Sequence, residues 1–240
     1  MAKSAFSTVD KEPSDYNLLG QRLGKKGRDT RERILAATER LLAGPPDAPI
    51  TLSAVAREAS LGMTSLYLYF NDLTELLLAQ LSATMVQAEE AYASHLRGHW
   101  SDETLGEDCF RFVEAYHAFW VRNSRILHLR NAYADSHDER MRKHRIEMSL
   151  PLIGFLVRQM ESDPAETNGR PFAMASVLLT SIERMITVTT DVGFTVKITL
   201  LHIDDADSQM HRLLGAEARL LELGIRDCRK AARAKKAASA

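Results

Sequence analysis

Residues 51–70 read TLSAVAREASLGMTSLYLYF and contain two short helical patterns separated by a break. In the first pattern, apolar residues recur at three- and four-residue spacing behind Thr51, a residue type that commonly caps helices. The second pattern covers 63–69, and the small residues of 59–62 allow a sharp turn between the two. Two helices joined by so tight a turn predict a helix-turn-helix, the motif that sends its second helix into the DNA major groove.

The composition predicts an all-α globular protein. Of the 240 residues, 45% are apolar and 26% are charged, which is typical of domains with an ample core. Only seven Pro and twelve Gly interrupt the long stretches with a helical period. The net charge of −1 does not point to nucleic acid, but residues 22–33 carry six basic side chains against two acidic ones. This local excess beside the 51–70 motif is the electrostatic feature that a DNA partner requires.

The cysteines and the N-terminus predict a cytoplasmic, nucleoid-associated protein. Cys109 and Cys228 lie far apart, each in a helical pattern, and fit reduced thiols. The N-terminus has no apolar signal region, and we expect no apolar run to be long enough to cross a bilayer.

The periodicity predicts about nine helices, arranged as a three-helix head followed by a helical body. The expected helical ranges are 29–43, 51–59, 63–69, 73–96, 102–122, 124–134, 136–160, 172–191 and a last helix from about 204. Residues 192–201 are rich in β-branched side chains and include Gly193. They fit either an irregular loop or a continued helix.

A longer pattern surrounds the motif. It consists of Ile-Leu-Ala-Ala at 34–37, Thr51, Val-Ala-Arg-Glu-Ala at 55–59, Ser-Leu-Tyr at 65–67, Tyr-Phe at 69–70 and Glu-Leu-Leu at 75–77. In these positions residues 29–78 resemble the DNA-binding head of the tetracycline-repressor (TetR) family of transcriptional regulators. The rest of the chain resembles that family only in length and helical content.

The resemblance implies a function and an organisation. We expect a disordered basic arm at 1–27, a helix-turn-helix DNA-binding domain at 28–72, a helical ligand-binding and dimerisation domain at 73–228, and a basic tail at 229–240. The protein would be a one-component repressor that binds a palindromic operator as a homodimer and is released by a small-molecule effector. Helices 172–191 and 204–224 would form the dimer as an intermolecular four-helix bundle.

Other functions stay open at this point. One is a TetR-like activator, or a regulator controlled by a protein partner. Another is an all-helical enzyme or scaffold in which the helix-turn-helix is incidental. We expect no enzyme and no cofactor, because the sequence has no Gly-rich phosphate loop, nucleophile elbow or supported Cys-His pair.

The resemblance also implies the DNA-binding residues. Thr64 and Ser65 would reach base edges or phosphate, Tyr67 and Tyr69 would reach phosphates, and Leu68 would meet a thymine methyl. Thr51 would cap its helix and meet a phosphate. Lys25, Lys26 and Arg28 would form an arm that reaches phosphates or the minor groove. The alternative is that apolar side chains of this segment are buried in the core, which we expect of Leu66 and Phe70 and, in part, of Tyr67.

Four positions depart from the family pattern. Ser60 stands where the family usually has Gly, so we expect it in a left-handed or strained conformation. Gly62 replaces the usual Ser or Thr cap of the second helix and is a weaker cap. Leu68 replaces a residue that is commonly polar or basic, and Leu73 stands where a Lys often neutralises a phosphate. Asp72 and Glu75 are still spaced for a capping box at the start of the next helix.

A ligand pocket is a further hypothesis for the body. The candidate lining residues are Phe112, Tyr116, Trp120, His128, Tyr133, Met148 and Phe155, with His117, Arg130 and Arg158 as additional polar groups. They fit a mainly apolar effector with one polar or acidic group. The alternative is that the aromatic residues simply fill the core. We expect no metal, since His95 with His99, and His137 with His144 and Glu147, give no complete ligand set.

Overall fold

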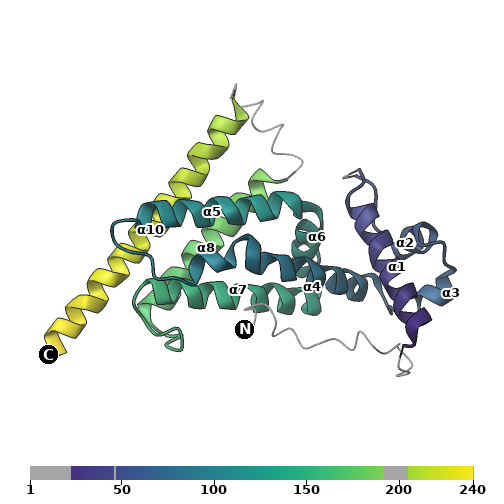
Figure 1. Ribbon diagram of the computed structural model, residues 1–240, viewed down its shortest axis with the longest axis horizontal. Coiled ribbons are helices and arrows are strands. Elements are labelled where there is room, and N and C mark those ends of the chain that lie inside the picture. The colour runs from purple at the N-terminus through teal and green to yellow at the C-terminus, as the bar shows by residue number, and fades with distance from the viewer. Residues whose placement is uncertain (1–22, 46, 192–204, 240) are drawn as a thin grey trace. The chain divides into compact units, whose positions relative to one another are not determined.

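The computed structural model describes residues 23–45, 47–191 and 205–239 of the chain. These residues form nine α-helices and one short 3-10 helix and contain no β-strand, which confirms the predicted all-α fold (Figure 1). In chain order the helices are α1 (Lys25–Leu42), α2 (Leu52–Glu58), α3 (Met63–Leu66), α4 (Leu73–Ala91), η1 (Ala93–Leu96), α5 (Leu105–Arg122), α6 (Ser124–Asp135), α7 (Glu139–Gln159), α8 (Arg170–Thr189) and α10 (Ala206–Ser239). The predicted ambiguity at 192–201 lies outside the described residues.

Backbone contacts divide the chain into two compact units. Unit 1 comprises residues 1–87 and 125–145, and unit 2 comprises 88–124 and 146–240. The predicted boundary at 72/73 therefore does not coincide with a boundary between units. Residues 125–145, which the sequence predicted to be part of the body, belong to the same unit as the head segment, helices α1 to α3.

The core of unit 1 joins α1, α2, α3 and the start of α4, and Figure 1 shows the first three gathered together. Its fully buried members include Ile34 of α1, Val55 of α2, Leu66 of α3 and Leu76 of α4. Each comes from the apolar stripe of its helix, so the periodicity of the sequence accounts for the core. The short helices α2 and α3 are stable here because each buries its apolar face in this shared core.

Helix α1 begins earlier than predicted. The expected arm at 1–27 was wrong for Lys25, Lys26 and Gly27, which form the first turn of α1 behind the N-cap Gly24. A Cβ at Gly27 would approach Leu23 Cδ2 to 2.8 Å. The absence of a side chain at Gly27 thus lets Leu23 pack, buried, against the first turn.

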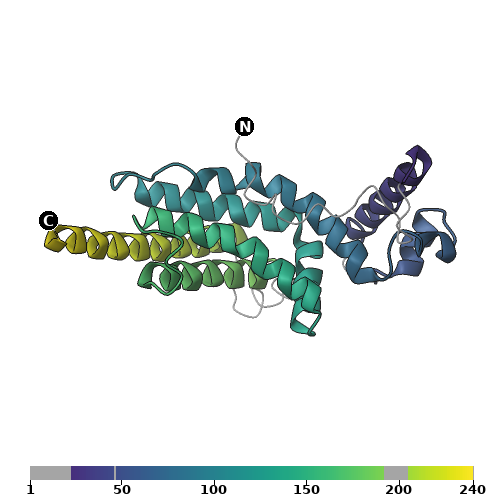
Figure 2. The same cartoon turned by 90° about the horizontal axis from the view of Figure 1, so that it is seen from below.

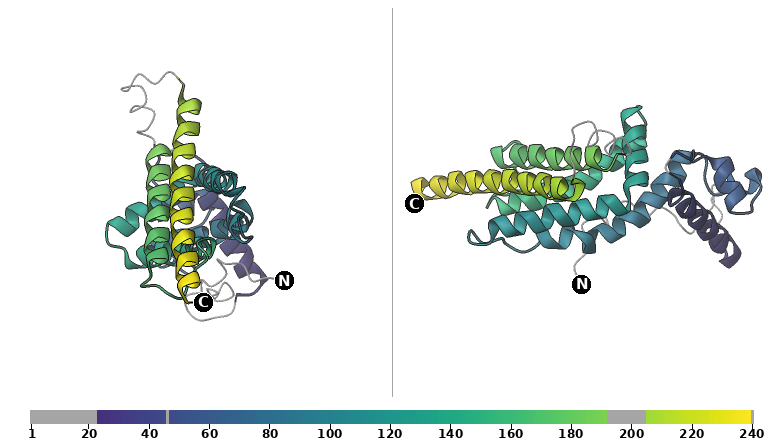
Figure 3. Two further views of the ribbon diagram at one scale, coloured as in Figure 1. Left: turned by 90° about the vertical axis from the view of Figure 1, so that its left-hand side faces the viewer. Right: turned by 90° about the horizontal axis from the view of Figure 1, so that it is seen from above.

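In unit 2, α10 packs against α5 and α8. Figure 3 shows α8 and α10 side by side, and a Cβ at Gly224 of α10 would lie 2.6 Å from Leu178 of α8. The small residue therefore permits the close approach of the two helices. The C-terminal end of α10 extends past the start of α8 in Figure 2. A basic tail was predicted from residue 229, but α10 continues to Ser239, since its Ala-rich sequence has high helix propensity.

A buried guanidinium ties α10 to the rest of unit 2. Arg229 is 2% exposed and donates hydrogen bonds to the carbonyl oxygens of Gln159 and Trp100 at 2.7 Å, and to Asp102 Oδ1 at 2.6 Å. Hydrogen bonds from Arg233 and then from Arg229 lower the pKa of Asp102 to about 2. Its stabilising contribution is therefore present above the ordinary carboxyl pKa and is lost as the pH falls toward about 2.

Helix α8 has the length and composition of a membrane-spanning helix. It is the one described helix with these properties, and 28% of its apolar stretch is buried, which corrects the expectation that no run is long enough. Residues 171–189 carry two charged side chains, Glu183 and Arg184. A single such helix is a weak indication of a membrane, because core helices of soluble proteins share this length and composition.

Substitution of Arg229 tests how much the buried guanidinium contributes to stability in comparison with a surface ion pair. Arg229→Leu should lower the free energy of unfolding by about 3 kcal/mol, because it leaves buried carbonyl oxygens without donors. The control is Arg219→Leu, whose side chain is exposed and pairs with Glu222, and which should cost less than about 1 kcal/mol. Urea unfolding measures both changes, and equal losses would contradict this role of Arg229.

Candidate functional site

The segment between α2 and α3 forms a tight, fully hydrogen-bonded turn. Thr51 caps α2, its Oγ1 accepting a hydrogen bond from Ala54 N at 3.1 Å, as predicted. At the other end, Leu61 N donates to Ala56 O at 2.8 Å and Ser60 N donates to Arg57 O at 3.1 Å. This pair of bonds is the Schellman motif, which requires a left-handed residue after the helix end.

Ser60 is that left-handed residue, with φ of 52°, which confirms the expected conformation. The chain then enters α3 through Gly62, which caps the helix without a side-chain hydrogen bond, as predicted. The turn is thus built by the backbone, and Ser60 adopts a conformation that favours glycine.

Helix α3 is shorter than predicted. It ends at Leu66, and Tyr67, Leu68 and Tyr69 continue as turns, in which Leu68 N donates to Ser65 O at 3.3 Å and Tyr69 N donates to Leu66 O at 3.0 Å. Phe70 N still donates to Leu66 O at 3.2 Å, and the Phe70 side chain is buried in the core three residues before α4 begins at Leu73.

The burial pattern of α3 separates core residues from surface residues. Leu66 and Phe70 are buried, as expected of core positions. Thr64 is exposed, and Tyr67 and Leu68 are about half exposed. The remaining two candidates, Ser65 and Tyr69, are partly buried, and Tyr69 packs against the core.

The basic candidates lie at the start of α1 in the same unit. Lys25, Lys26 and Arg28 are exposed, and Arg28 Nη1 donates to Leu23 O at 2.7 Å. The guanidinium of Arg31 lies 5.3 Å from the centroid of the Phe70 ring, over its face. This cation–π contact joins α1 directly to the turn that follows α3.

The start of α4 is held by an altered capping arrangement. Asp72 Oδ1 accepts from Glu75 N at 2.8 Å, as a capping box requires. The carboxylate of Glu75, however, accepts from Asn71 N at 2.7 Å instead of from Asp72 N. The prediction of the box is therefore correct for one of its two bonds, since the second bond is made one residue earlier.

Residues 125–145 contact the head segment at two places within unit 1. At the first, Arg125 Nη1 donates to Leu41 O at 2.6 Å and to Gly44 O at 3.1 Å, and Nη2 donates to Ala48 O. Leu41 lies in the last turn of α1, where a helix leaves its last acceptors unpaired, and Gly44 and Ala48 lie in the segment that follows. A positive charge at that end is also favoured by the helix dipole.

The second contact is at the start of α4. Thr74 Oγ1 donates to Asp138 Oδ2 at 2.8 Å, and Arg140 lies 3.0 Å from Asp72 in an ion pair. Asp138 also accepts from Met141 N at 3.1 Å and so caps the start of α7. The pKa of Asp138 is lowered by these hydrogen bonds and by Arg140 in spite of the opposing effect of its burial.

Three of the predicted ligand-binding residues lie together in the core of unit 2. Phe112 and Tyr116 of α5 stack at 5.9 Å between centroids, and Tyr92 packs edge-on against Tyr116 at 4.6 Å. Trp120 is buried on the same face of α5. Tyr116 OH donates to Glu183 Oε1 of α8 at 2.9 Å. These rings pack on one another, as the core interpretation expects.

The other predicted ligand-binding residues are divided between the units. His128 and Tyr133 of α6 are half-buried in unit 1, whereas Met148 and Phe155 of α7 belong to unit 2. Met148 is buried, and the guanidinium of Arg158 lies 4.6 Å from the Phe155 ring centroid. The seven residues are thus divided between the two units, and the pocket stays a prediction.

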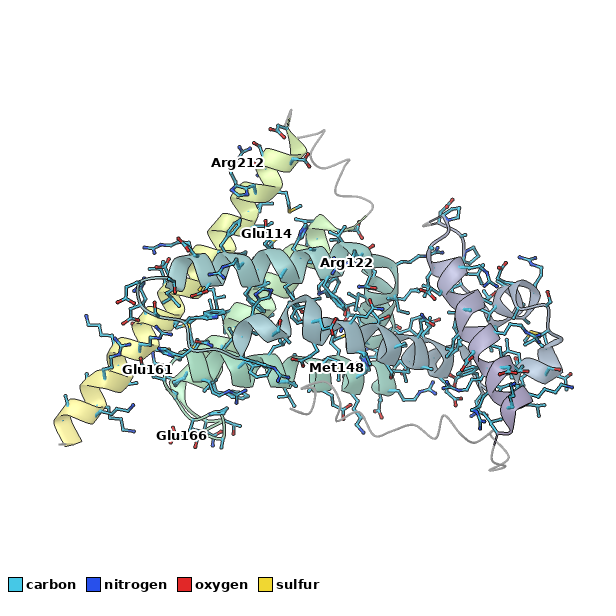
Figure 4. The ribbon with its side chains drawn as sticks, viewed as in Figure 1. Glu114, Arg122, Met148, Glu161, Glu166 and Arg212 are labelled. Atoms are coloured by element: carbon cyan, nitrogen blue, oxygen red, sulfur yellow. The ribbon has the colours of Figure 1, made fainter. Side chains whose placement is uncertain are left out.

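A cleft of about 510 Å³ lies elsewhere in unit 2. It is bordered by Glu161, Asp163, Glu166, Arg170, Cys228 and Lys236, among others. Figure 4 shows Glu161 beside the C-terminal half of α10 and Arg212 near its other end. Acidic and basic side chains border the cleft in similar numbers, and both oxygens of Glu161 accept from Arg233. None of the predicted ligand-binding residues borders it.

Two polar residues with structural roles escaped the sequence analysis. Arg125 and Arg229 donate hydrogen bonds to backbone carbonyls that are far away in the sequence, so no local sequence pattern predicts these contacts. His144 was considered only in an incomplete metal-ligand set, and it is buried in unit 1. Within the part of the chain that the structure describes, no group of three His, Cys, Asp or Glu side chains is arranged to hold a metal.

Comparison with protein-family models gives no match, and comparison with curated proteins gives none either. The interpretation of the site therefore rests on the residues of the 51–70 segment, their burial and their neighbours.

The left-handed residue in the turn gives a test of this local geometry. Ser60→Gly should raise the free energy of unfolding by about 1 kcal/mol, because glycine adopts a positive φ without steric cost. Ser53→Gly, the same replacement inside α2, should lower it by about 1 kcal/mol. Thermal and urea unfolding measure both, and destabilisation by Ser60→Gly would contradict the turn described here.

Proposed function

We propose that the protein is a one-component transcriptional repressor of the TetR type, which binds a near-palindromic operator as a homodimer in the cytoplasm. The observation that carries the proposal is the 51–70 segment, in which two short helices share a core and leave Thr64, Tyr67 and Leu68 exposed. An exposed face of this kind on a helix-turn-helix suits contact with base edges and phosphates.

The charges of the neighbouring helix support the same proposal. Lys25, Lys26 and Arg28 stand exposed at the start of α1, in the unit that contains α3. Since phosphate contacts supply most of the non-specific affinity for DNA, such a cluster is the expected companion of a base-reading segment. In this proposal the phosphate contacts come from the first turn of α1 as well as from any residues before it.

A second copy of the chain is the proposed partner. Val177 of α8 and Leu220 and Leu223 of α10 are exposed apolar side chains on two helices that pack together. Two such helices from each of two copies would form a four-helix bundle and remove these side chains from water. The apolar character of α8 is consistent with a helix that becomes covered in this way.

Release from the operator would follow from a change in the spacing of the two heads. The recognition segments of a dimer must lie about 34 Å apart to enter successive major grooves. A small molecule that binds a state with another spacing more tightly would lower operator affinity. Helix α4 is the candidate link, since its residues contribute to both units.

Operator binding is tested first by selecting bound duplexes from random DNA. The wild-type protein should enrich a near-palindrome and bind it with an affinity that falls steeply with salt. Tyr69→Phe should weaken this binding about five-fold through loss of one hydrogen bond to a phosphate. Tyr133→Phe in α6 is the control and should leave gel-shift affinity unchanged. The proposal fails if no sequence is enriched and binding shows no salt dependence.

The dimer interface is tested with two substitutions of equal starting exposure. Leu220→Arg should convert the dimer to a monomer, because a charge would be buried without a partner. Val121→Arg on α5 is the matched control, since both native side chains are 51% exposed. Light scattering at fixed protein concentration gives the mass of each. A Leu220→Arg variant that remains dimeric would exclude this face of α10.

A further inference from the structure

His144 of α7 is a buried histidine whose polar atoms are unsatisfied. The residue is 4% exposed, and neither Nδ1 nor Nε2 has a hydrogen-bond partner among the described residues. A neutral imidazole carries one donor and one acceptor, and leaving a buried polar group unpaired costs about 1–3 kcal/mol. Buried polar side chains are nearly always paired in folded proteins. A histidine with both nitrogens unpaired therefore points to a group that binds there.

A buried positive charge lies beside this histidine. Arg130 of α6 is 4% exposed, and its Nε and Nη2 donate to Asn131 Oδ1 at 3.2 and 3.1 Å. Burial, and then the charge of Arg130, lower the pKa of His144 to about 4. At neutral pH the site therefore combines a neutral imidazole with a guanidinium, and both residues belong to unit 1.

We propose that His144 and Arg130 bind the carboxylate of a small organic acid. A carboxylate accepts hydrogen bonds from both an imidazole N–H and a guanidinium, and these charge-assisted bonds are the strong ones. A cationic ligand would be repelled by Arg130. This site deepens the proposed function by naming the chemical class of the effector, and its regulatory meaning rests on that function.

Binding of a carboxylate would be linked to a proton. The negative charge next to the imidazole raises the pKa of His144, and the protonated ring then donates from both nitrogens. The bound state holds more protons than the free state, so affinity increases as the pH falls below the pKa of the bound state. If binding takes up one proton, the increase in affinity approaches about ten-fold per pH unit. The increase ends near the pKa of the acid itself, where the ligand loses its charge.

Both residues of the site lie a few positions along the chain from contacts with α1 and α4. Arg130 lies five residues after Arg125, which contacts the end of α1. His144 lies six residues after Asp138, which contacts the start of α4. A ligand between α6 and α7 would thus lie between the two segments that contact α1 and α4. An effector requires such a connection between its own site and the head segment.

The experiment uses the full-length chain and a graded series of acids: acetate, propionate, butyrate and benzoate, each paired with its neutral amide. Imidazole NMR signals and thermal unfolding are followed from about pH 7 to about pH 6, above the ordinary carboxyl range. The carboxylates should shift the His144 signal in a saturable way and raise the melting temperature, more at the lower pH. The amides should do neither. The acid that binds most tightly indicates the size of the ligand that the site accommodates.

His144→Leu identifies the signal and should abolish both effects. This variant is expected to fold, because it removes two unpaired polar atoms from the interior. The control is His99→Leu, at an exposed histidine of unit 2, which should bind like the wild type. Equal carboxylate effects on the wild-type and His144→Leu proteins would overturn the proposal, and so would a His144 signal that no acid moves.

The two proposals fail separately. Carboxylate binding is measured without DNA, so a chain that binds acids but no operator contradicts only the proposed function. A chain that binds an operator but no acid contradicts only the site at His144 and Arg130.

Discussion

The burial of Leu66 and Phe70 is the constraint on which the candidate site depends. Both side chains enter the core that α1, α2 and the start of α4 share. Because they are four residues apart with α3 ending between them, Tyr67 and Leu68 are left outside. Arg31 reinforces this from α1 by packing on the Phe70 ring. The exposed face is therefore a consequence of core packing, which determines its orientation.

The turn before α3 relies on the backbone instead of on side chains. Two backbone hydrogen bonds close it, with Ser60 in the left-handed region. Neither the cap at Gly62 nor the residue in the left-handed position is the chemically best choice. Such local costs persist where the surrounding structure determines the conformation, and the shared core supplies that determination here.

Polar contacts of long sequence separation complete both units. Arg125 satisfies carbonyls at the end of α1, and Arg229 satisfies carbonyls of the segments that meet α10. In each case one guanidinium, with its fork of donors, replaces water for several backbone acceptors. Among the described residues, Gln80 Oε1, His117 Nε2 and both ring nitrogens of His144 are buried without a hydrogen-bond partner. His144 differs from the other two residues because both of its polar atoms are unpaired.

The sequence alone was enough to predict the all-α fold, the cap at Thr51, the left-handed Ser60 and the burial of Leu66 and Phe70. All of these depend on helical periodicity or on residues within a few positions of each other. Tertiary structure decided that α3 stops at Leu66, that 125–145 belongs to the unit of the head segment, and that the candidate pocket residues fall in two units. It also decided which carbonyl oxygens Arg125 and Arg229 contact, and that His144 is buried without a hydrogen-bond partner among the described residues. These features depend on which residues, distant in the sequence, come close to one another in the folded chain. The spacing of residues along the sequence does not predict such contacts.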